Sequence, residues 1–320
     1  MASRQRALRL DVGAVAPEDH EMLCNRTLSA VLMLSLVPLL SQAAAAKTYR
    51  QVDFRSADTQ PTSLQLKRAE VQDGPLGRPG DTLTGFLRVP DGDGPFPAAI
   101  LLHGCEGIKA FQQDWAAYLT AQGYVTLLVD SFSARGQRDP ICDKVSTEKR
   151  SKLVSGRVFD AFGALDYLAQ QPFVAPDRIA GLAWTRESGI SLTNDDSVSQ
   201  FFDRKFAASV QFYPECRSTK PGGQFHAPLL LLLPGENDWA VYGDCTGLAE
   251  NSSGVKPVVK RLEGARYGFD DPAFQPETVM PEWENIYKTP PKGVTVAYSQ
   301  PAAEAARDDV VEFLADSLRE

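Results

Sequence analysis

Histidine is scarce in this sequence, with only three among 320 residues, at positions 20, 103 and 226. Imidazole is the side chain that most often moves protons in enzymes near neutral pH, because its pKa lies close to 7. A base of this kind must therefore be His20, His103 or His226. A catalytic site built anywhere else needs a different group.

The sequence also lacks a cluster of basic side chains, a Pro/Gly/Ser-rich linker and an internal repeat. Its 33 Lys and Arg against 41 Asp and Glu give a net charge of −8. Nucleic acid and anionic membrane surfaces are unfavourable partners for such a chain, so we expect a small-molecule substrate or ligand. Without a linker, residues 47–320 are predicted to form a single domain with a full core.

The apolar run at 28–40 (LSAVLMLSLVPLL) has 13 residues, whereas a membrane-spanning helix needs about 20. Small residues follow it in SQAAAAK, so we interpret 1–46 as an N-terminal extension with a signal peptide cleaved near Ala45 or Ala46. This predicts an exported protein, periplasmic or secreted, with no stable membrane insertion after cleavage. A buried helix is the alternative interpretation, and Met22 is an alternative start.

Five cysteines are present, and Cys24 would leave with the signal peptide. The remaining four are an even number in an oxidising compartment, which favours two disulfides. Four cysteines allow three pairings, and the nearer pairs would close loops worth very roughly 3 to 4 kcal/mol each. A zinc site is the alternative, although no CxxC or HxxxH spacing occurs, and no cofactor is indicated. The nearer pairs are Cys105 with Cys142 and Cys216 with Cys245.

From Pro97 onward, apolar strand-like runs alternate with helical patterns. This alternation is typical of a parallel sheet covered by helices on both faces, and ligands of such sheets bind beyond the carboxyl ends of the strands. LQLKRAEVQ (64–72) and TLTGFLRV (82–89) predict an antiparallel hairpin at one edge. The runs are 97–104, 124–132, 177–184, 206–214, 227–235 and 256–265, and the helical patterns are 111–123, 147–171 and 302–318.

The helical pattern at 147–171 has one apolar face that we expect to lie on the sheet. Its charged residues, Asp160 among them, are predicted to point outward. Arg157 is expected to form a structural ion pair. The apolar face consists of Val154, Val158, Phe162, Leu165 and Leu168.

Six segments follow one another in the order LLHGCEG, WAAYLTAQGYVTLLVDSFSARG, RVFDAFGALDYLAQQPFVAPDRIA, FYPEC, PLLLLLPGENDW and GARYGFDDP. This order resembles the dienelactone hydrolase family of α/β-hydrolases over roughly residues 80–320. The resemblance implies an α/β-hydrolase fold, with a mostly parallel central sheet and helices on both faces. It also implies a nucleophile, an acid and a histidine in that chain order, each after a different strand.

The family's nucleophile lies in a tight strand-to-helix turn with small residues two places to either side. The resemblance places it at Thr185, in the frame 183–187 (AWTRE). A β-branched residue is poorly suited to the positive φ of this turn, and Glu187 stands where glycine is expected. Ser188 is an alternative nucleophile, but the frame around it, 186–190 (RESGI), does not match the turn pattern.

Asp238 follows the apolar run PLLLLLPG and occupies the acid position by resemblance, with an ordinary loop aspartate as the alternative. At the histidine position the family has His-Gly-Phe, and this sequence has Tyr267 before the same Gly-Phe. Imidazole accepts and returns a proton near neutral pH, whereas a phenol titrates near about 10 and stays protonated at pH 7. Tyr267 can therefore donate a proton but cannot readily accept one.

Further residues are placed near the pocket by their positions at strand ends. The resemblance puts an oxyanion hole at 103–107 (HGCEG), where His103 is a catalytic candidate with a structural role as the alternative. His226 precedes a strand, at the opposite end, and is interpreted as structural. Glu106 and Arg135 are expected to face the crevice, with loop packing as the alternative. The predicted oxyanion-loop and pocket residues are His103, Gly104, Cys105, Glu106, Trp184, Arg186 and Arg135.

Three functional hypotheses follow. The first is hydrolysis of esters or lactones, with Thr185 attacking and Asp238 and Tyr267 assisting. The second is a non-catalytic ligand-binding or scaffold protein, a pseudoenzyme, because nucleophile, flanking glycine and histidine are all replaced. The third is a different reaction in the same pocket, with Tyr267 as acid and Glu187 or Glu106 as base.

Overall fold

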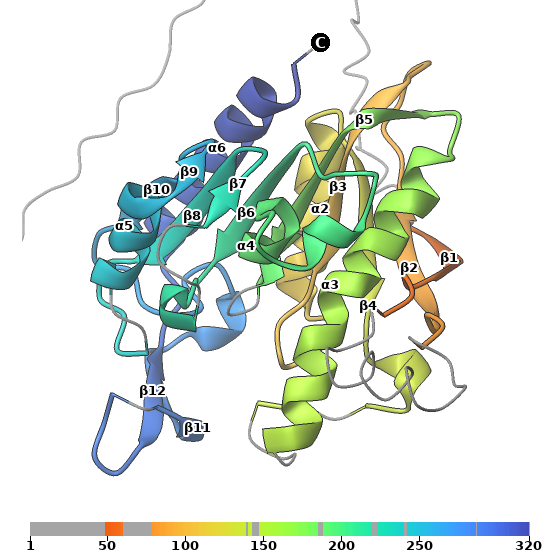
Figure 1. Ribbon diagram of the computed structural model, residues 1–320. Coiled ribbons are helices and arrows are strands. Elements are labelled where there is room, and N and C mark those ends of the chain that lie inside the picture. Colours follow the sequence, from red (N-terminus) through yellow and green to blue (C-terminus); the bar gives the residue numbers. More distant parts are fainter. Residues whose placement is uncertain are drawn as a thin grey trace, which may run out of the picture. The chain divides into compact units, whose positions relative to one another are not determined.

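The computed structural model describes residues 49–59, 78–138, 140–142, 147–184, 188–218, 223–239, 242–285 and 287–319. The predicted signal peptide lies outside these residues. At the centre is an eight-stranded sheet in the order β1-β2-β4-β3-β5-β6-β8-β10 (Figure 1). The strands are β1 (Arg50–Arg55), β2 (Thr82–Arg88), β3 (Phe96–Leu102), β4 (Val125–Asp130), β5 (Val174–Ala183), β6 (Ala208–Phe212), β8 (Leu229–Pro234) and β10 (Val258–Leu262).

The sheet is mostly parallel. Every neighbouring pair from β4 to β10 is parallel, whereas β2 runs antiparallel to both β1 and β4. The central strands are continuous apolar runs, and all six residues of β8 are buried. Such runs need cover on both faces, because each strand presents side chains alternately to either side. The predicted α/β-hydrolase fold is confirmed.

Helices cover both faces of the sheet (Figure 1). Helices α2 (Ala110–Ala121) and α6 (Gln300–Ser317) share one apolar core, and α3 (Thr147–Ala169), α4 (Ser188–Thr193) and α5 (Tyr242–Asn251) pack on the other face. Full burial of one large apolar side chain on such a face contributes about 1.5 to 3 kcal/mol. Among the described helices, none is long and apolar enough to cross a membrane.

Asp160 is not exposed, as its charge predicts, but is fully buried. Its carboxylate accepts two hydrogen bonds from Arg135, each 2.8 Å, and one of 2.7 Å from the Ser56 hydroxyl. A buried charge is tolerated when its lone pairs are satisfied in this way. Hydropathy alone therefore predicts the wrong degree of exposure for this residue.

The antiparallel partner of β2 also differs from the prediction. It is β1, which pairs Arg50 with Leu87 and Arg55 with Thr82. The segment 64–72, predicted as that partner, lies outside the described residues. The edge of the sheet is thus closed by a strand from an earlier part of the chain.

An antiparallel hairpin between β10 and α6 has no counterpart in the sequence-based prediction. It consists of β11 (Thr278–Glu284) and β12 (Lys292–Val296) and extends beyond the main sheet at the bottom of Figure 1. Its inner side chains, Trp283, Val294 and Val296, are buried with Cys142. A second short pair joins β7 (Gln224–Phe225) to β9 (Ser253–Gly254).

Candidate active site

The loops after β3, β5, β6 and β10 meet at the carboxyl end of the sheet around a cavity of about 30 Å³. This volume is close to the share of one water molecule in the liquid. The predicted residues Gly104, Cys105, Glu106, Trp184 and Tyr267 lie together here. The remaining lining residues are Gly107, Lys109, Phe111, Gln112, Tyr213, Gly268, Asp271, Phe274 and Trp283.

The strand-to-helix turn lies between Ala183, the last residue of β5, and Ser188, the first of α4. Thr185, Arg186 and Glu187 lie outside the described residues. The Gln211 side chain of β6 holds both flanks, because its Nε2 donates to the Ala183 carbonyl (3.0 Å) and its Oε1 accepts from the Gly189 N–H (2.8 Å). A Cβ at Gly189 would stand only 2.9 Å from the Val210 carbonyl oxygen. This helix start therefore needs glycine.

A buried carboxylate that the sequence analysis missed lies beneath the cavity. The Oδ2 of Asp270 accepts hydrogen bonds from the indole Nε1 of Trp115 and of Trp184, both 2.8 Å, and the Tyr213 hydroxyl donates to its Oδ1. Burial raises the pKa of Asp270 to about 7, although the two indole N–H groups act in the opposite direction. One side chain thus connects α2 and the loops after β5, β6 and β10.

Tyr213 has a φ of 53°, a conformation that bulky residues rarely adopt. Among the described residues it is the only non-glycine with positive φ. Its hydroxyl is fixed on Asp270, its ring packs 4.5 Å from that of Tyr267, and it lines the cavity. Strained backbone of this kind persists where the surroundings determine the conformation, and such places cluster at functional sites.

Tyr267, at the histidine position, lies among aromatic rings. Its centroid is 4.7 Å from Trp239 and 5.9 Å from Trp283, both edge-on. Its backbone forms a bridge to Val296 of β12. The hairpin β11–β12 therefore packs directly on the residue that the sequence analysis predicts at the histidine position.

Asp238, at the acid position, lies beside this cluster, but its carboxylate is bonded to the hairpin region. Lys288 Nζ is 2.6 Å from Oδ2, and Thr295 donates through both its hydroxyl (2.7 Å) and its backbone N–H (3.1 Å). Partial burial acts to raise the pKa of Asp238, but these hydrogen bonds outweigh it and lower the pKa. Asp238 is therefore an ionised carboxylate that accepts hydrogen bonds from Lys288 and Thr295.

His103 is buried behind the loop 104–107. The Ser131 N–H donates to its Nε2 (3.2 Å), and its Nδ1 lies 2.8 Å from the Gly104 carbonyl oxygen and 2.9 Å from Nη2 of Arg157. Arg157, also buried, donates to the same carbonyl (2.5 Å) and stacks over Phe132. Burial first, and then the charge of Arg157, lowers the pKa of His103 to about 3. The imidazole is neutral and both nitrogens are engaged.

Arg135 contacts Asp160 and Asp81 and does not line this cavity. Its hydrogen bonds to Asp160 raise its pKa above the ordinary value, against the effect of burial. Glu106 does line the cavity and lies 3.8 Å from Lys109 Nζ. Of the two residues expected to face the crevice, the structure brings one to it.

Two disulfides cross-link the segments that follow the strands at this end of the sheet. Cys105 is bonded to Cys142 and Cys216 to Cys245, which are the nearer pairings in sequence, and two disulfides are thus confirmed. The first joins the loop after β3 to the loop after β4. Within the described ranges, no group of three or more His, Cys, Asp and Glu side chains is placed to hold a metal ion.

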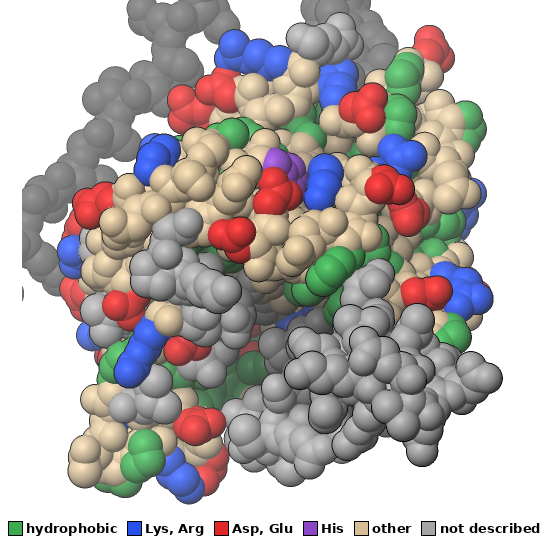
Figure 2. Space-filling view, viewed as in Figure 1, with side chains coloured by type: hydrophobic (Ala, Val, Ile, Leu, Met, Phe, Trp, Pro, Cys, Tyr) green, Lys and Arg blue, Asp and Glu red, His purple; other side chains and the backbone are tan. Residues whose placement is uncertain are grey.

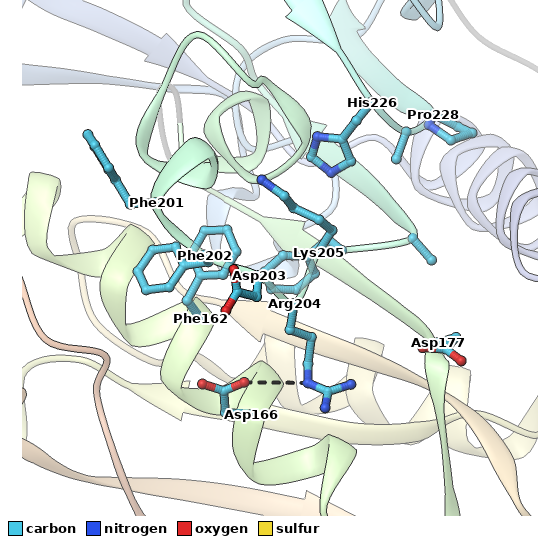
Figure 3. A pocket seen from close by; sticks show the side chains of 13 residues that line it. Phe162, Asp166, Asp177, Phe201, Phe202, Asp203, Arg204, Lys205, His226 and Pro228 are labelled. Atoms are coloured by element: carbon cyan, nitrogen blue, oxygen red, sulfur yellow. Dashed lines mark ion pairs between the residues drawn. The ribbon is translucent and has the colours of Figure 1, made fainter.

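A larger cavity of about 870 Å³ lies at the amino ends of β6 and β8 (Figure 3). Two of its lining residues form ion pairs: Arg204 lies 3.5 Å from Asp166, also in the lining, and His226 Nδ1 lies 2.9 Å from Asp195, which is outside the lining. His226 precedes β8, as predicted, far along the strand from the candidate site. On the face shown in Figure 2, acidic and basic side chains are interspersed.

The strand order and the positions at the strand ends define this chain as an α/β-hydrolase fold, and within that class it is similar to dienelactone hydrolases. A dienelactone hydrolase-like promiscuous phosphotriesterase from metagenomic libraries superposes with a TM-score of 0.57 at 14% identity, over 85% of this chain and 100% of the other. A protein assigned as a dienelactone hydrolase from Klebsiella pneumoniae gives 0.53 at 14% identity, over 83% and 99%.

In sequence, the chain is 25% identical over 229 residues to a Bradyrhizobium protein named as a probable 2-oxo-3-(5-oxofuran-2-ylidene)propanoate lactonase. The match covers 66% of this chain and 89% of the relative. No family model matches the sequence. The predicted resemblance is confirmed at the level of fold.

Proposed function

We propose that this protein keeps the dienelactone hydrolase fold and pocket as an exported, non-catalytic small-molecule-binding protein that does not run a nucleophile–histidine–acid triad. The observation that carries the proposal is the state of His103. Its two ring nitrogens are engaged by Ser131 and Gly104, and burial keeps it neutral. Tyr267 stands where the base would be, and a phenol is a poor proton acceptor at pH 7.

The acid position supports the same proposal. In a triad the carboxylate orients the base and stabilises its charge. The Asp238 carboxylate instead accepts from Lys288 and Thr295. Removal of a single triad member lowers kcat by roughly 10⁴- to 10⁶-fold, so any hydrolysis left to an oxyanion hole would be slow.

The second candidate is an ester or lactone hydrolase with Thr185 as nucleophile. The similarity to a lactonase over 229 residues favours it. It needs Tyr267 as the base, and a phenol accepts a proton less readily than imidazole near neutral pH. The expected rate is correspondingly low.

Turnover of p-nitrophenyl acetate and dienelactone by purified residues 47–320 separates the two candidates. We expect no rate above buffer for the wild type or for Thr185→Ala, and no covalent labelling by a fluorophosphonate probe. Turnover or labelling that disappears in Thr185→Ala, while Ser188→Ala retains it, would establish the hydrolase and overturn the proposal.

Export is proposed from the apolar run 28–40, and the two disulfides are compatible with an oxidising compartment. Cell fractionation followed by N-terminal sequencing tests it. We expect a mature chain that begins near Lys47 outside the cytoplasm. A cytoplasmic full-length chain with four free thiols at the paired positions would contradict it.

A further inference from the structure

The polar contacts between the β11–β12 hairpin and the loop after β8 centre on Asp238, beside the backbone bridge from Tyr267 to Val296 and the apolar packing of the hairpin. In addition to its bonds to Lys288 and Thr295, Asp238 accepts from Asn285 Nδ2 at its backbone carbonyl (2.8 Å). The next residue, Trp239, donates from its indole to the Glu284 carbonyl (2.8 Å). The side chain at the family's acid position thus joins the hairpin to the loop after β8.

The hairpin and the segment before it close the candidate site. Trp283 is 4% exposed and lines the cavity together with Phe274. Phe274 packs so closely on Gly268 that a Cβ there would meet its ring at 2.3 Å. Only about 30 Å³ of space remains beneath these two rings.

The surfaces that would be uncovered by moving the hairpin include four aromatic rings, set among glycine and polar residues. Phe111, Trp184, Tyr213 and Tyr267 form the body side of the cavity. Aromatic pairs prefer offset-stacked or edge-on contact and gain about 0.5 to 1.5 kcal/mol beyond their buried area. The rim carries the Glu106–Lys109 pair. Such walls favour a flat unsaturated ligand over a saturated one of similar volume.

We infer that the β11–β12 hairpin is a lid latched by Asp238, and that the site beneath it takes a planar aromatic or conjugated small molecule, which displaces Trp283. The inference rests on the proposed function in one respect, that the site binds its ligand and leaves it intact. Because the cavity beneath the hairpin offers only about 30 Å³, a ring is expected to enter only when the hairpin moves. Its apparent affinity is reduced by the open fraction.

Asp238→Asn and Lys288→Met both break the latch, and calorimetric titration with p-nitrophenol reports the change in the open fraction. Loss of a partly buried charge-assisted hydrogen bond is enough to raise the fraction of molecules with an open hairpin about tenfold, if that fraction is small. Because apparent affinity is proportional to the open fraction, we expect about tenfold tighter binding in either variant. Acrylamide quenching of tryptophan fluorescence should increase in parallel. Lys292→Met is the matched control, because it removes a lysine of the same hairpin whose ion pair, within the described residues, is with the exposed Glu282.

Trp283→Ala is expected to open the site by itself, so that adding Asp238→Asn changes binding no further. Trp283→Leu serves if the alanine variant does not fold. Cyclohexanol should bind at least tenfold more weakly than p-nitrophenol. Unchanged binding and quenching in both latch variants would overturn the lid, and equal binding of the two ligands would overturn the ligand class.

These outcomes are separate from the hydrolysis assay. If Asp238 were the acid of a catalytic triad, Asp238→Asn would lose turnover, whereas Lys288→Met would not lose it in the same way. If Asp238 acts as a latch, Asp238→Asn and Lys288→Met should have the same effect on ligand binding. The binding titration alone measures that effect. Failure of the latch with no turnover would leave the proposed function standing.

Discussion

The two ends of the central sheet are built differently. At the carboxyl end, both disulfides cross-link neighbouring segments, three tryptophan and tyrosine donors converge on Asp270, and the cavity holds about 30 Å³. At the amino end, the cavity is about 870 Å³, and its charges form surface pairs such as Arg204 with Asp166. The larger cavity is thus at the amino ends of the strands. In open α/β sheets, ligands bind beyond the carboxyl ends.

The contrast teaches that volume alone does not locate a functional site. Surface ion pairs contribute about 0 to 1 kcal/mol to stability. A buried carboxylate that accepts from three donors contributes more, because its loss would leave each donor buried without an acceptor. We therefore expect substitutions at the carboxyl end to cost far more stability than those at the amino end. Four measurements test this difference, from the largest expected effect to the smallest.

Asp270→Ala should be the most damaging. It leaves the donors of Trp115, Trp184 and Tyr213 buried without an acceptor, at about 1 to 3 kcal/mol each, so we expect a loss of about 3 to 6 kcal/mol in the free energy of unfolding. Urea denaturation measures it. Asp270→Asn, which retains one acceptor oxygen, should lose less, and a loss below about 1 kcal/mol for the alanine variant would remove Asp270 as the organising group.

Replacement of Cys105 and Cys142 by serine should lower the free energy of unfolding by about 3 to 4 kcal/mol, because the bond closes a loop of 37 residues. The same exchange at Cys216 and Cys245, with a separation of 29, provides a comparison at the same end of the sheet. Denaturation under non-reducing conditions is the measurement. Stability equal to that of the wild type would mean that the cross-links do not constrain the unfolded chain.

The two aspartates near the site should give opposite pH dependences. The folded pKa of Asp270 is raised to about 7, above an ordinary value of about 3.9, so its contribution to stability is present at low pH and is lost as the pH rises through that range. The pKa of Asp238 is lowered, so its contribution is present above about pH 4 and is lost as the pH falls.

Urea unfolding between pH 3 and pH 8 of the wild type, Asp270→Asn and Asp238→Asn tests these signs. The free energy of unfolding of the wild type, relative to that of Asp270→Asn, should be higher at pH 4 than at pH 7. The difference for Asp238→Asn should diminish below pH 4. Asp271, whose pKa is also raised by burial, is present in every variant and cancels.

Arg204→Ala, at the amino end, should have the smallest effect. Its pair with Asp166 spans 3.5 Å between side chains that are 39% and 57% exposed, so a change within about 0.5 kcal/mol is expected. Thermal unfolding at low and high salt measures it. A loss above about 1.5 kcal/mol would erase the contrast between the two ends.

The core of this fold follows from local pattern. Continuous apolar runs such as β8 fit buried strands, and the helix faces follow from spacing. The hairpin could not be found in this way, because β11 is largely exposed, carries Pro281 and pairs only with β12. Strands of this kind leave neither an apolar run nor a clean alternation.

The site was predictable in part. Position at strand ends brought Gly104, Trp184 and Tyr267 together. Asp270 was missed because its partners are 57, 86 and 155 residues away in sequence, and no local spacing relates them. The role of Asp238 depends on Lys288 and Thr295, whose hairpin was itself not predicted. Errors therefore concentrate where long-range polar contacts decide the arrangement.

Gln211 holds the two flanks of the strand-to-helix turn, so the sequence of the turn can change while its ends stay in place. It binds the backbone on both sides, at Ala183 and at Gly189, from a strand that takes no part in the turn itself. A different tripeptide at 185–187 could therefore be introduced between these two anchor points, with Trp184 kept as a donor to Asp270. For an engineer, or for natural selection, the scaffold separates the sequence of the nucleophile loop from the frame that holds it.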